Sequence, residues 1–174
     1  KLDEQSRANI LADLLKRDPN NYSAYEGTVQ EIVDDVRARG DEALFEYTKK
    51  FDGAELSADN IRVTQAEIQE ALSQVDPNLL AVMKKSMKNI REYHEKQKRY
   101  SWFDSKPNGT ILGQKVSALS SVGVYVPGGK AAYPSSVLMN IIPAEVAGVE
   151  KIVMVTPPGK DGKVNPVTLI AAHL

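Results

Sequence analysis

The residues best placed to do chemistry lie where an apolar strand pattern gives way to a Pro-Gly-Gly turn. The sequence from Val122 to Gly129 reads VGVYVPGG, and a helix pattern starts soon afterwards, at Ser135 or Ser136. Such a junction places backbone N–H groups and the positive end of a helix dipole beside the carboxyl end of a strand. In open α/β sheets, ligands bind at that edge. The motif is not the dinucleotide-binding GxGxxG pattern. Its strand–turn–helix arrangement therefore predicts only a crevice for an anionic ligand or a nucleotide.

Four residues of this junction are candidate contacts for a cofactor: Tyr125, Pro127, Gly128 and Gly129. A tyrosine at the end of a strand offers a ring face and a hydroxyl group to a nucleotide. Glycines allow a ligand to approach the backbone without a Cβ atom in the way. The residues alone leave alternatives open, since Tyr125 could pack in the core beneath the next helix and the glycines could serve the turn only. Lys130 could pair with a phosphate or be an exposed loop lysine.

Helical signals dominate residues 1–100, which we expect to form a mainly helical N-terminal region. Capping boxes at Thr28–Glu31 and Thr64–Glu67 predict two helix starts. The pair Asp76-Pro77 opens the longest predicted helix, which should run to about Arg99, with proline at its favoured first position. A short strand is plausible over residues 61–63.

Extended patterns take over near residue 100, so residues 101–174 are expected to form a partial α/β domain with a hairpin at its start. Pro143 should kink or split the helix that contains it. The wholly apolar run Ile152–Val155 is typical of a parallel strand buried on both faces, and an uncovered edge there should lead to self-association. The expected elements are a hairpin around Pro107–Gly109, a strand over Val122–Val126, a helix from Ser135 or Ser136 to Gly148, a strand over Ile152–Val155 and a helix from Val164.

Composition excludes several classes of protein. The net charge is −1, so there is no bulk electrostatic case for a nucleic acid or an anionic membrane as partner. No apolar run approaches the ~20 residues that a membrane helix requires. The chain has no cysteine, which excludes thiolate metal ligands and disulfides and fits a cytoplasmic protein.

One histidine lies on an apolar helical stripe. His94 and Gln97 continue the spacing of Met83, Met87 and Ile90. His94 is therefore either a ligand-site residue or a core histidine satisfied by one hydrogen bond, and the second role is the more common one.

The amino-acid sequence itself identifies the class of protein more specifically than the physical properties of its residues do. The run from Ser121 to Pro158, SVGVYVPGGKAAYPSSVLMNIIPAEVAGVEKIVMVTPP, closely resembles the histidinol dehydrogenase family. Two further segments agree with this, ARGDEAL at Ala38–Leu44 and the helix residues Asn89 to Gln97. The resemblance implies an NAD- and zinc-dependent enzyme that oxidises L-histidinol to L-histidine through the aldehyde. It also implies a homodimer and an incomplete Rossmann-like, aldehyde-dehydrogenase-like parallel sheet after the helical N-terminal part.

The resemblance carries one cofactor residue onto this chain. Tyr125 matches the NAD-contacting tyrosine of the family's Y-[IV]-P-G-G motif. The family's zinc ligands and its Glu-His pair lie beyond the position that matches Leu174, so we expect an N-terminal fragment that holds no catalytic and no metal-binding residues. Such a fragment should be inactive alone and should bind neither NAD nor zinc tightly. The alternatives are a stand-alone nucleotide- or phosphate-binding module and a helical interaction protein.

Overall fold

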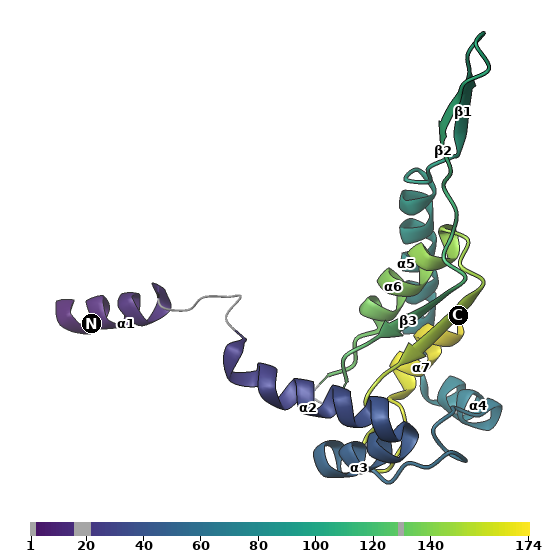
Figure 1. Cartoon of the computed structure of the whole chain (residues 1–174). Helices are drawn as coiled ribbons and strands as arrows, with labels where there is room; N and C mark the ends of the chain where they lie inside the picture. The colour runs from purple at the N-terminus through teal and green to yellow at the C-terminus, as the bar shows by residue number, and fades with distance from the viewer. Residues whose placement is uncertain (1–2, 16–21, 129–130) are drawn as a thin grey trace. The chain divides into compact units, whose positions relative to one another are not determined.

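The computed structural model describes residues 3–15, 22–128 and 131–174 of the chain. The described residues form two compact units, and the boundary between them falls between Tyr47 and Thr48. Helices and a small parallel sheet make the fold mixed α/β, as predicted (Figure 1). The predicted change near residue 100 marks where helices give way to strands. It is not where the chain divides into units.

The first unit consists of helices. Helix α1 spans Glu4–Leu15 and α2 spans Ser23–Arg39, and α3, Asp41–Asp52, begins in this unit. Gly40 joins α2 to α3 with a φ of 63°, a left-handed conformation that favours glycine. The Arg39 guanidinium holds the corner by bonding the carboxylates of Asp35 and Glu46, at 2.7 and 2.8 Å.

The predicted helix start at Thr28 is wrong. Helix α2 begins five residues earlier, at Ser23. The backbone carbonyl of Tyr22 accepts hydrogen bonds from the N–H groups of Tyr25 and Glu26, and these bonds form the first turn. Thr28 therefore lies inside the helix, where a capping role is not needed.

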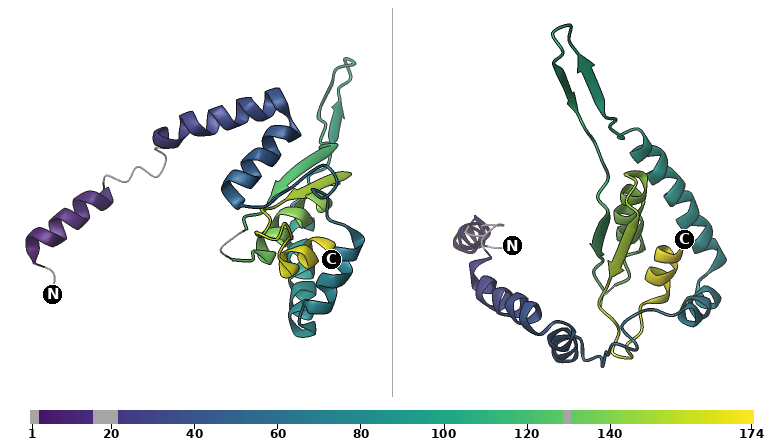
Figure 2. Two further views of the ribbon diagram at one scale, coloured as in Figure 1. Left: turned by 90° about the horizontal axis from the view of Figure 1, so that it is seen from below. Right: turned by 45° about the vertical axis from the view of Figure 1, so that its right-hand side comes forward.

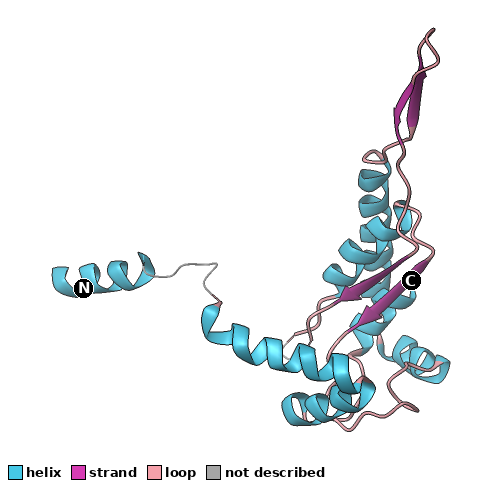
Figure 3. Ribbon diagram, in the orientation of Figure 1, coloured by secondary structure: helices cyan, strands magenta, loops and turns pink. Residues whose placement is uncertain are grey.

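The second unit holds the sheet and most of the helices (Figure 3). Strands β1 and β2 pair with each other as an antiparallel hairpin, which confirms the predicted turn around Pro107–Gly109. Strands β3 and β4 form a separate parallel pair. After α3 the elements are α4 (Gln65–Gln74), α5 (Pro77–Glu95), β1 (Trp102–Ser105), β2 (Ile111–Gln114), β3 (Ser121–Tyr125), α6 (Pro134–Val146), β4 (Lys151–Val155) and α7 (Pro166–His173).

Local signals account for the starts of α4 and α5. The hydroxyl of Thr64 accepts from the backbone N–H of Glu67, and the Glu67 carboxylate accepts from the backbone N–H of Thr64, so the predicted capping box is confirmed. Asp76 caps α5 by accepting from Asn78 N–H at 2.9 Å. Helix α5 ends at Glu95, short of the expected Arg99.

The structure corrects one local expectation, the strand over residues 61–63, and excludes one of the two outcomes expected at Pro143. Residues 57–61 form a turn held by the Asn60 side chain, which accepts from Ser57 N–H at 2.6 Å, and residues 61–63 lie outside the strands. Pro143 does not split α6, which is one helix from Pro134 to Val146. Buried core side chains lie on both sides of the proline, Ile142 before it and Val146 after it, and their packing offsets the lost backbone hydrogen bond.

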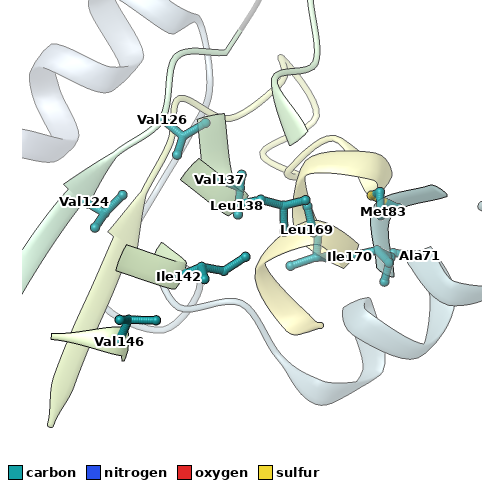
Figure 4. Packing of buried hydrophobic residues seen from close by; sticks show 11 residues of the cluster. Ala71, Met83, Val124, Val126, Val137, Leu138, Ile142, Val146, Leu169 and Ile170 are labelled. Atoms are coloured by element: carbon teal, nitrogen blue, oxygen red, sulfur yellow. The ribbon is translucent and has the colours of Figure 1, made fainter. Parts of the chain in front are cut away.

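The core of this unit lies between the sheet and helices α4 to α7 (Figure 4). Helix α6 packs against both α5 and α7, and α7 also packs against α4. Ile142 and Ile170 are among the largest fully buried side chains. An ion pair between Arg91 and Glu145 joins α5 to α6 at the surface. The buried core side chains are Ala71, Met83, Val124, Val126, Val137, Leu138, Ile142, Val146, Leu169, Ile170 and Ala171.

Strand β4 is covered on one face rather than two. Ile152 and Met154 are half-buried against the core, whereas Val153 is 47% exposed and Val155 is also exposed. The expectation of burial on both faces is therefore not met among the described residues of this unit. Its helices lie on the face of the sheet that carries the even-numbered residues of both strands.

In the described part of the chain, no helix combines the length and the apolar character that crossing a membrane would require.

Candidate functional site

The carboxyl ends of β3 and β4 lie at the same edge of the sheet. The two strands are parallel, with Tyr125 opposite Val155. The N–H of Val126 donates to the carbonyl of Val155 at 2.9 Å, which extends the pairing by one residue. The segments that follow the two strands leave the sheet side by side, so the turn after β3 and the loop after β4 lie against each other.

Gly128 lies close against the loop that follows β4. A Cβ atom built at Gly128 would lie 3.1 Å from the carbonyl oxygen of Pro157 and 3.2 Å from Oγ1 of Thr156. Those distances are shorter than ordinary van der Waals contacts. Glycine therefore allows the two segments to meet at the edge where ligands bind in parallel α/β sheets.

Tyr125 lies on the open face of the sheet. Its neighbours Val124 and Val126 are buried in the core, while Tyr125 is 62% exposed because alternate residues of a strand face opposite sides. Beside it is a shallow depression of about 290 Å³, which Asn140 and Ala144 of α6 also line. The structure thus contradicts the alternative of a core tyrosine beneath α6. Contact with NAD stays a prediction.

A larger cleft of about 540 Å³ opens at the same edge of the sheet. Its walls are α4, the segment around Gly128, the loop after β4 and the first turn of α7. Of the three predicted site residues that the structure describes, Gly128 alone lines this cleft, while Pro127 is exposed beside it. Gly129 and the neighbouring Lys130 lie outside the described residues.

Charged side chains on the cleft wall were missed by sequence reasoning. Lys163 donates to Glu70 of α4 at 3.0 Å, which raises the pKa of Lys163. The hydrogen bonds that Glu67 accepts from Thr64 lower the pKa of that glutamate. Glu70 and Lys163 are 93 positions apart, so no local pattern could have paired them. The capping box was visible, but its place beside the cleft was not.

Two helices start near this edge with different caps. The Asn165 side chain caps α7 by accepting from Val167 N–H at 3.0 Å. Helix α6 begins after Tyr133 without a side-chain cap. Of these two helices, α6 is therefore the one that lacks a side-chain acceptor at its capping position. An anion or a water molecule could accept hydrogen bonds from the N–H groups of its first turn.

His94 has a hydrogen-bond partner just beyond the end of its own helix, α5. Its Nδ1 atom lies 2.6 Å from Oε1 of Gln97, and its ring meets that of Tyr93 edge-on. Across the described residues, no group of three or more histidine, aspartate or glutamate side chains is arranged to hold a metal ion.

Comparison with known proteins gives a consistent result. The family model for histidinol dehydrogenase matches residues 15–174. Histidinol dehydrogenase of Bacillus subtilis is 59% identical over 145 residues, and that of Heliobacterium mobile is 58% identical over 145 residues. Both alignments cover 83% of this chain and 34% of the relative.

A solved structure agrees in fold. The crystal structure of histidinol dehydrogenase from Elizabethkingia anophelis superposes with a TM-score of 0.79 at 34% identity, over 86% of this chain and 34% of that one. The chain thus spans about a third of the length of the relatives it matches. With the family match covering nearly the whole chain, this protein belongs to the histidinol dehydrogenase family.

Proposed function

We propose that this chain provides part of the NAD-binding region of a histidinol dehydrogenase, which oxidises L-histidinol to L-histidine through the aldehyde. The observation that carries the proposal is the exposed ring of Tyr125 at the carboxyl end of a parallel strand, directly before the turn at Gly128. Family membership supplies the reaction and the substrate. When bound, NAD would supply the hydride acceptor, one molecule for the alcohol and a second molecule for the hydrated aldehyde.

The residues of this chain would bind and orient the cofactor. The ring of Tyr125 offers a flat apolar face to one of the cofactor's rings, and its hydroxyl offers a hydrogen bond. Pro127 holds the backbone at the turn, while Gly128 and Gly129, as glycines, carry no Cβ atom that could block a cofactor. In this proposal these four residues are the cofactor contacts.

The charges around this edge favour one side of it for the cofactor's phosphates. The larger cleft is lined by three carboxylates and one cation, Lys163, which is paired with Glu70, so its net negative charge would repel a pyrophosphate. The first turn of α6 has no side-chain cap and presents the positive end of its dipole. We therefore place the phosphates beside the start of α6 rather than against α4.

The described residues do not fit a zinc site. A protein zinc site needs at least three converging nitrogen, oxygen or sulfur ligands, and no such group exists among the described side chains. No step of the reaction is therefore assigned to zinc on this chain. We propose that zinc and the acid-base residues belong to other parts of the full-length enzyme, which is a homodimer of the cytoplasm.

The experiment is a titration of the isotope-labelled chain with NAD, followed by two-dimensional NMR. We expect weak, saturable shifts of amide signals in residues 121–128. Tyr125→Ala should reduce them at least fivefold. Tyr93→Ala is the matched control, because Tyr93 is equally exposed, at 63%, but lies on α5. Equal loss in both variants, or saturable shifts confined to other segments, would count against the site.

A further inference from the structure

The β1–β2 hairpin stands apart from the core of its unit. It extends past the end of α5, away from β3, β4 and α6, in each of the views (Figures 1 and 2). Apart from each other, β1 and β2 make at most slight contact with the described helices and strands. Each residue from 100 to 116 is exposed. The turn at the tip of the hairpin therefore lies open to water.

This turn is formed by Pro107, Asn108 and Gly109. The N–H of Lys106 donates to the carbonyl of Thr110 at 2.8 Å, and the N–H of Gly109 donates to the carbonyl of Lys106 at 3.0 Å. Gly109 has a φ of 84°, which favours glycine. Because a two-stranded hairpin alone is marginally stable in water, the bond that holds the Gly109 N–H opens readily.

The Asn108–Gly109 pair places an electrophilic carbon beside a backbone nitrogen. The electrophile is the side-chain amide carbon of Asn108, and the nucleophile is the nitrogen of Gly109 once it has lost its proton. Glycine has no Cβ atom to hinder their approach. The Asn108 side-chain oxygen accepts from the N–H of Thr110 at 3.0 Å. A donor in that position stabilises the negative charge that attack would place on the oxygen.

Asn108 differs in this respect from the other asparagines of the chain. It is the only one of nine that precedes a glycine. The residues after the other eight have side chains that crowd the nitrogen, and Pro166 has no N–H to lose. Asn89 and Asn140 also lie inside α5 and α6, where helical hydrogen bonds hold the backbone. The reaction is therefore expected at one asparagine ahead of all others.

We propose that Asn108 is a site of spontaneous deamidation. The Gly109 nitrogen gives up its proton and forms a bond to the side-chain carbon of Asn108. The bond from that carbon to the side-chain nitrogen breaks, and ammonia leaves with the proton, so a five-membered succinimide ring remains. Water then opens the ring at either of its two carbonyl groups, which gives aspartate or isoaspartate at position 108. Neither step oxidises or reduces the chain, and water is the only co-reactant.

The modification changes both the charge and the backbone of the hairpin. Residues 100–116 carry Asp104, Lys106 and Lys115, so one new carboxylate lowers their net charge from +1 to 0. In isoaspartate the chain runs through a side-chain carbon, which inserts one extra atom into the backbone of the turn. Because the turn sets the register of a hairpin, the inserted atom falls where the pairing of β1 with β2 is fixed.

Peptide mapping of the aged 174-residue chain tests the proposal. Samples incubated in mildly alkaline buffer are digested with trypsin, which releases residues 100–115 as one peptide because the bond after Lys106 precedes a proline. Exchange of the side-chain nitrogen for oxygen raises the mass of this peptide, and fragmentation assigns the change to Asn108 or to Gln114. We expect modification of Asn108 to be at least tenfold faster than that of any other asparagine.

Two variants of the turn separate this chemistry from simple flexibility. Gly109→Ala strains the turn because φ is positive there, and it adds a Cβ atom beside the attacking nitrogen. Although the turn is loosened, deamidation should slow at least fivefold. Pro107→Ala is the matched control, because it also loosens the turn but keeps the glycine. Its rate of deamidation should equal or exceed that of the parent chain.

Two results would overturn the proposal. The first is an aged chain in which another asparagine is modified as fast as Asn108 or faster. The second is a Gly109→Ala variant that deamidates at the parent rate or above it, which would show that flexibility of the turn, and not attack by the glycine nitrogen, sets the rate.

Discussion

Replacing Gly128 with alanine should force apart the two segments that meet at the candidate site. The added methyl group would lie 3.1–3.3 Å from atoms of Pro157 and Thr156, whereas relaxed contacts begin near 3.4 Å. The nearest of these atoms is a backbone carbonyl oxygen, which cannot swing aside as a flexible side chain can. Gly123→Ala is the matched control, because nothing lies within 4 Å of a Cβ atom built there.

The magnitude follows from comparing the two variants. Both gain the same ~0.4–1 kcal/mol by restricting the unfolded chain, so that contribution cancels in the difference. What remains is the overpacking at Gly128, for which about 1–2 kcal/mol is expected because the contacts are short by only a few tenths of an ångström. Neither glycine has a positive φ, so backbone strain contributes to neither variant.

Urea unfolding followed by circular dichroism measures this difference. With a slope of ~1–3 kcal/mol per molar urea, Gly128→Ala should unfold about 0.3–2 M earlier than Gly123→Ala. Equal midpoints for the two variants would show that the segments after β3 and β4 do not meet as described, and the close approach at the site would be refuted.

Three further outcomes are expected. Ile170→Ala, at a side chain with no exposed surface, should lower the free energy of unfolding by about 2–5 kcal/mol in the same urea assay, and a loss below 1 kcal/mol would contradict the packing of α7. The capping hydrogen bonds lower the pKa of Glu67, so the stability that they contribute is fully present above pH 4.5 and is lost as the pH falls through the folded-state pKa. The free energy of unfolding, measured against pH, should therefore depend less on pH in Glu67→Gln than in the parent chain. Identical pH profiles of the two would refute this role of Glu67. The chain mixed with histidinol, NAD and zinc should form no NADH and retain no stoichiometric zinc after gel filtration, and turnover by the pure chain would contradict our assignment of the zinc and acid-base residues to other parts of the enzyme.

Features set by a few neighbouring residues were predictable from the sequence. The Thr64–Glu67 capping box, the Asp76 cap and the Pro107–Gly109 hairpin each satisfy their hydrogen bonds within a short stretch, so the pattern carries the structure. The parallel strands were predicted for a similar reason, since Val122–Val126 and Ile152–Val155 are short apolar runs on either side of a helical pattern.

Features set by packing were not predictable in this way. The continuity of α6 through Pro143 depends on partners on two sides of the helix. The cleft wall depends on α4 meeting the loop before α7, which no local spacing encodes. Tyr125 lay between these cases: its place at the end of a strand was predictable, but its exposure depended on which face of the sheet the helices cover.

The most direct test of the proposed function is a kinetic measurement on a chimera. This chain replaces the matching segment of the Bacillus subtilis relative, to which it is 59% identical, and the KM values for NAD and histidinol are measured. We predict that the chimera is active, and that Tyr125→Ala raises the KM for NAD at least tenfold while the KM for histidinol changes less than threefold. Tyr93→Ala should change neither. If Tyr125→Ala leaves the KM for NAD unchanged in an active chimera, the assignment of the β3 edge as a cofactor site is contradicted.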